Sequence, residues 1–168
     1  SPVTYLTMGD FGNNFTLSFP HSKKLTFYSA SGEMIDSVIL PDSRFFDYNL
    51  HGADQILDFS EIFASGESNK VHVPTNHYFN SIHGNREQVI VETWMNNKKT
   101  GEEYATYSHL LIYNKAAKKW SETSNPKNIL EIGMLAGVVN DTLYFYEGSL
   151  MKHDEKYIKR AVLRPIED

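Results

Sequence analysis

The sequence contains no cysteine, which excludes disulfide bonds and metal sites built on thiolates. It also has no apolar run near the roughly 20 residues that a membrane-spanning helix requires. Positive charge is in deficit, because 16 lysines and arginines stand against 21 acidic residues and no basic stripe is present. Phosphate-backbone binding depends on such a stripe. We therefore expect no transmembrane segment and no nucleic-acid partner.

Several functional motifs are missing as well. The chain has no P-loop, no G-x-G-x-x-G segment and no G-x-S-x-G nucleophile turn. No helical pattern of convincing length appears either. These absences remove the common signatures of nucleotide binding and serine hydrolysis, and we expect no cofactor.

What the sequence does have is an abundance of strand-forming residues. Apolar residues make up 40% of the chain and aromatic residues 13%, which excludes a disordered protein. A length of 168 residues suits one domain, residues 1–168, with a sizeable core. Turn residues separate the apolar runs. The expected strands are residues 3–7, 15–19, 25–29, 34–40, 44–50, 56–63, 143–146 and 157–163.

Some of these segments carry further detail. The alternation of Phe15, Leu17 and Phe19 with polar residues predicts a half-buried strand. The two glycines, the aspartate and the two asparagines of residues 8–14 predict a turn before it. Residues 56–63 fit a strand first and a short helix second. Residues 71–82 contain Pro74 and are expected at an edge, whereas the apolar run 129–139 is interrupted by glycines.

We interpret the rest of the fold around the segment from residue 88 to residue 120. Two β-branched and aromatic runs flank the polar loop NNKKTGEE, and a second polar loop leads to Trp120, which predicts an antiparallel meander. In the first run Val89 and Val91 fall on one face, and Ile90 and Trp94 on the other. Neither face is purely polar, so we expect this sheet to be covered on both sides. The fold class is therefore all-β, with antiparallel meanders arranged as part of a propeller or, alternatively, as a sandwich or barrel.

A resemblance supports the propeller. LLIYNKAAKKW, preceded by IVETW and LDFSEIF, resembles the repeated hairpin of the six-bladed β-propeller lipoproteins of Bacteroidota. Tyr113-Asn114-Lys115 stands where that family has Tyr-Asp-Lys, and the similarity covers about residues 55–125. It implies a blade-built fold in an extracytoplasmic location, the periplasm or cell surface, and transfers no catalytic residues. Since a blade takes about forty-odd residues, this chain holds three or four. We therefore expect self-association or a missing remainder of a longer chain.

The densest cluster of potential metal ligands is His72, His77 and His83. Imidazoles must converge within about 2.1 Å of one ion, and spacings of five and six place the first two on opposite faces of a regular strand. We therefore expect no metal, with these three as the residues to revisit.

Two functional classes remain open. The favoured one is a non-enzymatic binding module in which Trp94, Tyr104, Tyr107, Tyr113 and Trp120 present rings to a protein or carbohydrate ligand. The chain shows no nucleophile, base and orienting group in a recognisable pattern. The alternative is a hydrolase or lyase on a β scaffold, using Asp54, Asp58 or Glu92 with a histidine.

Overall fold

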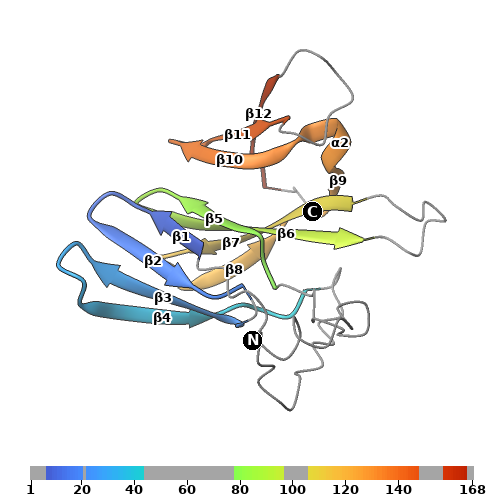
Figure 1. Ribbon diagram of the computed structural model, residues 1–168. Helices are drawn as coiled ribbons and strands as arrows, with labels where there is room; N and C mark the ends of the chain where they lie inside the picture. The colour runs from blue at the N-terminus through green and yellow to red at the C-terminus, as the bar shows by residue number, and fades with distance from the viewer. Residues whose placement is uncertain (1–6, 21, 44–77, 97–105, 148–156, 166–168) are drawn as a thin grey trace, which may run out of the picture.

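The computed structural model describes residues 7–20, 22–43, 78–96, 106–147 and 157–165. Within these ranges the chain forms three antiparallel sheets stacked as layers (Figure 1). The first sheet is the simple meander β1 (Thr7–Asp10), β2 (Asn14–Ser18), β3 (Lys24–Ser29) and β4 (Met34–Ile39).

The second and third sheets repeat this plan further along the chain. The second sheet contains β5 (Ser81–Gly84), β6 (Gln88–Asn96), β7 (Thr106–Asn114) and β8 (Lys119–Glu122), with the short β9 (Lys127–Asn128) also paired to β7. A single helical turn, α2 (Ile129–Ile132), leads to the third sheet, β10 (Met134–Val139), β11 (Thr142–Tyr146) and β12 (Ile158–Val162). The all-β class and the antiparallel meanders are thereby confirmed.

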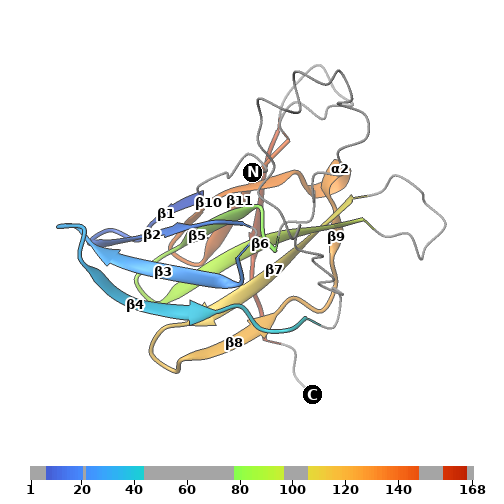
Figure 2. The same ribbon diagram turned by 60° about the horizontal axis from the view of Figure 1, so that its bottom comes forward.

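The first strands of the three sheets are neighbours in space. Both β1 and β10 contact β5, and Figure 2 shows the three strands grouped together. Gly9 makes the close approach of β1 to β5 possible, since a Cβ there would lie 3.0 Å from the Ile82 side chain. The three sheets are therefore closest to one another at β1, β5 and β10, and the remaining strands of each sheet follow outward from these.

The second sheet is covered on both faces, as its sequence predicts. One face carries Val89 and Val91 and packs against the first sheet; the other carries Ile90 and Ile112 and packs against the third. Burying each such side chain stabilises the fold by about 1.5–3 kcal/mol. Among the described residues, the buried members of the core between the first two sheets are Phe11, Leu25, Phe27, Leu40, Phe79, Ile82, Val89, Val91, Leu111 and Tyr113.

Two details differ from the sequence-based expectations at the start of the chain. Residues 8–10 belong to β1, not to a turn, and the turn follows at residues 11–13, where Gly12 adopts a φ of 88°. β2 is half-buried, but Thr16 and Ser18 are its buried residues. Their hydroxyls are satisfied inside the sheet, because Thr16 Oγ1 donates to the Thr26 carbonyl at 2.7 Å and Ser18 Oγ accepts from the Thr26 N–H at 3.2 Å. The apolar residues of β2 consequently point outward.

Other expected strands agree with the structure. The strands expected at 25–29, 34–40, 143–146 and 157–163 correspond to β3, β4, β11 and β12, and the interrupted run 129–139 is α2 followed by β10. The edge segment predicted at 71–82 enters the described residues only from Tyr78, where β5 begins at Ser81. The strands predicted at 3–7 (apart from Thr7), 44–50 and 56–63 lie outside the described residues.

Candidate functional site

The outer face of the first sheet carries a group of apolar side chains, of which Met8, Met34 and Ile39 are exposed and the others partly buried. Met8 pairs with Leu17 across β1 and β2, and Phe15 pairs with Tyr28, with the two rings stacked at 5.5 Å. Met34 pairs with Tyr28 and has 66% of its surface exposed. Such a row of apolar side chains on one sheet face is typical of a packed interface. We call it the first outer face: Met8, Phe15, Leu17, Tyr28, Met34 and Ile39.

The outer face of the third sheet has the same character. Tyr146 on β11 pairs with Ile158 on β12, and Ile158 has 69% of its surface exposed. Arg160 pairs with Tyr144 in the next row and is also exposed. We call this the third outer face: Val139, Tyr144, Tyr146 and Ile158. Among the described residues, exposed apolar side chains therefore lie on the outer faces of the first and third sheets, whereas the described apolar side chains in the middle of β6 and β7 are buried.

A buried carboxylate, Glu92, links the second sheet to the third. It is 1% exposed, and its Oε1 accepts hydrogen bonds from Ser108 Oγ at 2.6 Å and from the backbone N–H of Leu135 at 3.1 Å. Ser81 Oγ donates to its other oxygen at 3.2 Å. Hydrogen bonds to carboxylates are among the stronger ones in proteins. The bond from Leu135 joins β10 to β6, and the two serine hydroxyls hold the carboxylate in place within the second sheet.

His83 approaches the same backbone segment from β5. Burial lowers the pKa of His83, while a hydrogen bond to the backbone of Leu135 acts in the opposite direction. Its Nε2 is buried without a hydrogen-bond partner. The His83 imidazole therefore lies between the second and third sheets, on the strand that pairs with the strand of Glu92, and burial there favours its neutral form by lowering its pKa.

A second polar network lies between the first and second sheets. His109 Nδ1 is 3.2 Å from Thr93 Oγ1, and His109 Nε2 is 3.3 Å from Glu122 Oε2. Ser43 Oγ donates to the same carboxylate oxygen at 2.7 Å. A hydroxyl, an imidazole and a carboxylate in sequence are the components of nucleophilic catalysis. Here Thr93 is 1% exposed and His109 is 0% exposed, so both groups lie inside the stack, and the network joins β6, β7 and β8 to Ser43.

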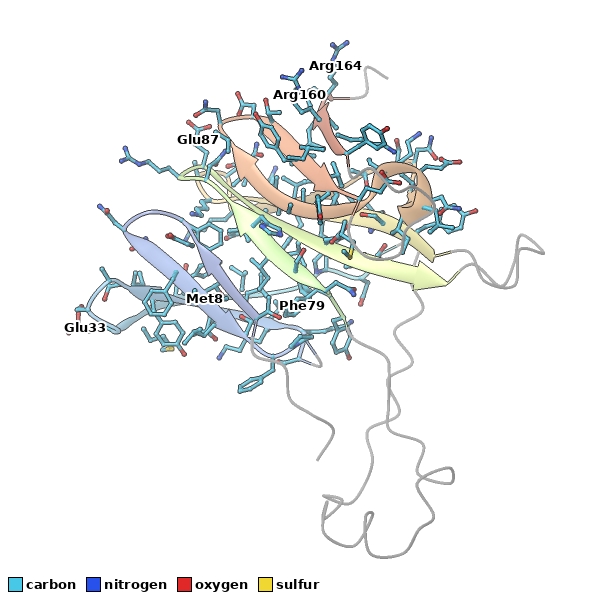
Figure 3. All side chains as sticks on the ribbon, turned by 45° about the horizontal axis from the view of Figure 1, so that its top comes forward. Met8, Glu33, Phe79, Glu87, Arg160 and Arg164 are labelled. Atoms are coloured by element: carbon cyan, nitrogen blue, oxygen red, sulfur yellow. The ribbon has the colours of Figure 1, made fainter. Side chains whose placement is uncertain are left out.

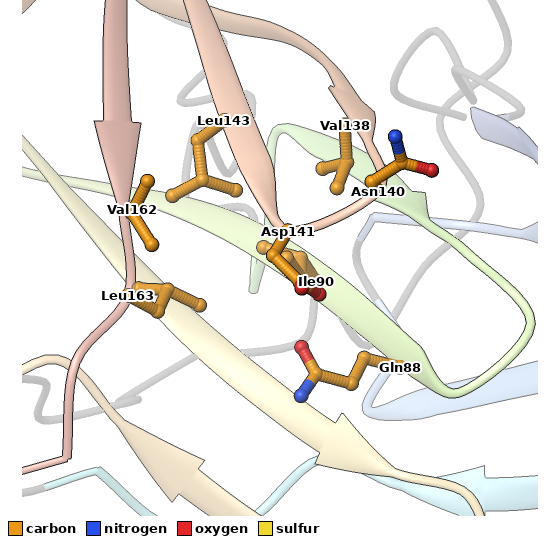
Figure 4. A pocket seen from close by; sticks show the side chains of 8 residues that line it. All are labelled: Gln88, Ile90, Val138, Asn140, Asp141, Leu143, Val162 and Leu163. Carbon is orange, nitrogen blue, oxygen red and sulfur yellow. The ribbon is translucent and has the colours of Figure 1, made fainter.

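The structure also contains a cavity of about 250 Å³ between the second and third sheets (Figure 4). Ile90, Leu143 and Leu163 supply its apolar wall, and Asp141 lies at the turn between β10 and β11. The turn is held in place because Asn85 Nδ2 donates to the Asn140 carbonyl at 2.9 Å. The remaining lining residues are Gln88, Val138, Asn140 and Val162.

The aromatic residues singled out in the sequence have different surroundings. Tyr113 is 7% exposed and packs on Trp120, which is partly buried, with ring centroids 5.0 Å apart. Both rings belong to the core between the first two sheets. Trp94 lies on β6 and Tyr107 on β7, near the same end of the second sheet, where Met95 pairs with Tyr107. The side chain of Trp94 and the whole of Tyr104 lie outside the described residues.

The candidate metal ligands are not brought together in the described part of the chain. His83 is placed as above, and no group of three histidine, cysteine or acidic residues suited to a metal occurs among the residues with defined positions. His72 and His77 fall outside these residues, as do Asp54 and Asp58 of the hydrolase alternative. Glu92, the third acid of that alternative, is the buried carboxylate that accepts hydrogen bonds from Ser81, Ser108 and Leu135.

Comparison with known proteins adds no relative, since no family model, curated protein or solved structure matches this chain. No helix in the described residues is long and apolar enough to span a membrane.

Sequence reasoning missed the residues that Glu92 binds. Ser81 and Ser108 are small polar residues on flanking strands, and nothing in their spacing indicates a shared carboxylate. The only signal was Glu92 itself, an acid inside a β-branched run.

Proposed function

We propose that this protein is a non-enzymatic interaction module of the β-propeller type, in which the three sheets are consecutive blades. The observation that carries the proposal is the contrast between the sheets. The middle one is buried on both faces, while the first and third outer faces present apolar residues to solvent. The grouping of β1, β5 and β10 along one line supports it, because blades of a propeller surround a common axis.

The function follows from the uncovered faces. An exposed apolar sheet face favours association, since contact with another such face removes it from water. The module therefore binds further sheets, from another copy or from the remainder of a longer polypeptide. An interface of at least about 1,000 Å² is expected.

The described polar groups support binding over catalysis. Glu92 and His109 are both buried and hydrogen-bonded within the stack. The aromatic residues near the ends of β6 and β7, together with Tyr104, remain our candidates for contact with a protein or carbohydrate ligand. The resemblance to exported propeller lipoproteins supports an extracytoplasmic location, which fractionation of the source cells tests.

Light scattering coupled to size-exclusion chromatography tests the association. We expect self-association at tens of micromolar, and we expect Met34→Lys and Ile158→Lys each to weaken it by placing a charge in an outer face. Leu130→Lys is the matched control, because Leu130 is an exposed apolar residue of α2 and does not belong to either outer face. A stable, non-aggregating wild-type monomer at tens of micromolar overturns the open stack and favours a self-contained sandwich.

A further inference from the structure

The third sheet differs from the other two at its outer edge. In the first and second sheets the third strand is paired on both sides, β3 by β2 and β4, and β7 by β6 and β8. Within the described residues, β12 pairs only with β11. The residues of β12, Ile158–Val162, make no other backbone hydrogen bond there. Alternate N–H and C=O groups of this strand therefore face outward and have no backbone partner among the described residues.

The packing under this edge also leaves a cavity. The cavity of about 250 Å³ borders the end of β12 at Val162 and Leu163. A strand placed beside β12 would occupy the position that β4 and β8 take in the other sheets, and it would extend the apolar cover over the second sheet.

The positive charge at the edge of β12 indicates the charge of the partner strand. Lys159, Arg160 and Arg164 lie on or just after β12 in a chain whose net charge is −5, and Figure 3 shows Arg160 and Arg164 projecting on the same side of the third sheet. A second copy pairing antiparallel about the centre of β12 would place Arg160 opposite its own equivalent. Like charges directly opposite one another destabilise a strand pair. The favoured partner strand is therefore acidic.

We propose that the free edge of β12 is a strand-addition site for an extended acidic peptide segment, which becomes the fourth strand of the third sheet. Backbone hydrogen bonds supply much of the affinity in this kind of recognition, and side chains supply the specificity. An acidic side chain of the peptide pairs with Arg160, and alternate apolar side chains cover the second sheet beside Leu163. The site is the edge of β12, whereas the proposed association uses the faces of the sheets, so the two are tested by separate measurements.

A suitable probe is a fluorescent synthetic peptide with the sequence EMIDSVIL, residues 33–40. This segment contains β4, the fourth strand of the first sheet, and carries two acids, Glu33 and Asp36. The control peptide has lysine in place of both acids. Binding is measured by fluorescence anisotropy on Met34→Lys protein, so that association through the first outer face does not interfere.

We expect saturable binding with a Kd of about 10–100 μM, and no comparable binding of the lysine peptide. Replacing both Arg160 and Arg164 with glutamate weakens the affinity by about tenfold or more. Arg86→Glu is the matched control, because Arg86 is an exposed arginine on the turn between β5 and β6. Lys159 is left intact because its Nζ donates to the Glu131 carbonyl and holds α2.

Hydrogen exchange locates the bound peptide. Amides at alternate residues of β12 become protected if the peptide adds as a strand. The proposal is overturned if the peptide does not bind up to about 1 mM, if the lysine peptide binds equally well, or if protection appears on the first outer face instead. Self-association of the wild-type protein is scored separately, so a failure here leaves the proposed function standing.

Discussion

The carboxylate of Glu92 on β6 accepts a hydrogen bond from the backbone N–H of Leu135 on β10 at 3.1 Å, across the gap between the second and third sheets. Backbone groups of a strand normally pair within their own sheet. Here a side chain from the neighbouring layer satisfies one of them. The contact therefore fixes the position of the third sheet relative to the second.

Replacing Glu92 with alanine leaves the Leu135 N–H and the hydroxyls of Ser81 and Ser108 without this acceptor. An unsatisfied buried donor costs about 1–3 kcal/mol, and we expect Glu92→Ala to lower the free energy of unfolding by about 3 kcal/mol or more. Urea denaturation followed by circular dichroism measures it. Glu33→Ala, at an exposed turn, should change stability by less than about 0.5 kcal/mol. Equal effects of the two variants would contradict the role of Glu92.

His83 should make stability depend on pH. Burial lowers its pKa in the folded state below the ordinary value of 6.5, so above that value both the folded and unfolded states are neutral at this residue. As the pH falls below 6.5, the unfolded state binds the proton first, and stability decreases until the folded-state pKa is reached.

The measurement is urea denaturation of wild-type and His83→Asn protein at about pH 7.5 and about pH 5.5. The wild type should lose more stability on acidification than the variant. Titration of the His83 ring protons by NMR provides a direct check. An apparent pKa above 6.5 would show that the imidazole is not desolvated as described.

Gly84 should tolerate no side chain. Its φ is 158°, and an added Cβ would overlap the Gln88 carbonyl oxygen and lie 2.9 Å from the Phe11 ring. Because backbone atoms cannot move aside cheaply, Gly84→Ala should destabilise the protein by about 3 kcal/mol or more. Gly137→Ala is the matched control, since nothing lies within 4 Å of a Cβ there. Thermal unfolding of both variants compares them directly.

Trp120 should contribute to stability through its contact with Tyr113. The ring is partly buried against the core between the first two sheets, so we expect Trp120→Ala to cost about 2–4 kcal/mol and Trp120→Phe less. Chemical denaturation gives both values. We expect Trp94→Ala to cost about 3–5 kcal/mol; this prediction rests on the sequence alone. Free quenching of tryptophan fluorescence in the folded protein would count against burial of either ring.

Removing metal should leave the protein unchanged. The described residues contain no set of ligands suited to an ion, and we expect EDTA to leave the melting temperature unaffected. Differential scanning fluorimetry with and without added zinc or calcium is sufficient. A large decrease with EDTA that zinc restores would direct attention to His72, His77 and His83.

The sequence by itself determined the class of fold and located several of the strands. Period-two alternation and turn residues located β3, β4, β6, β7, β11 and β12, because these are local properties of the chain. Residues 88–95 carry apolar side chains on both faces of the strand. The sequence therefore also predicted that the second sheet is covered on both sides. The candidate site was predicted less well, since the aromatic pattern cannot separate Tyr113, a core residue, from a ring exposed at a surface.

Only the tertiary structure decided which face of each sheet is buried and which polar groups meet. In β2 the hydroxyls of Thr16 and Ser18 point inward because Thr26 satisfies them, although alternation alone favours Phe15 and Leu17 there. Glu92 and Leu135 are 43 residues apart in the chain and meet only because the sheets stack. Alternation of polar and apolar residues shows that a strand has two different faces. Which face is buried depends on the element that packs against it, and that packing is decided by contacts between residues distant in sequence.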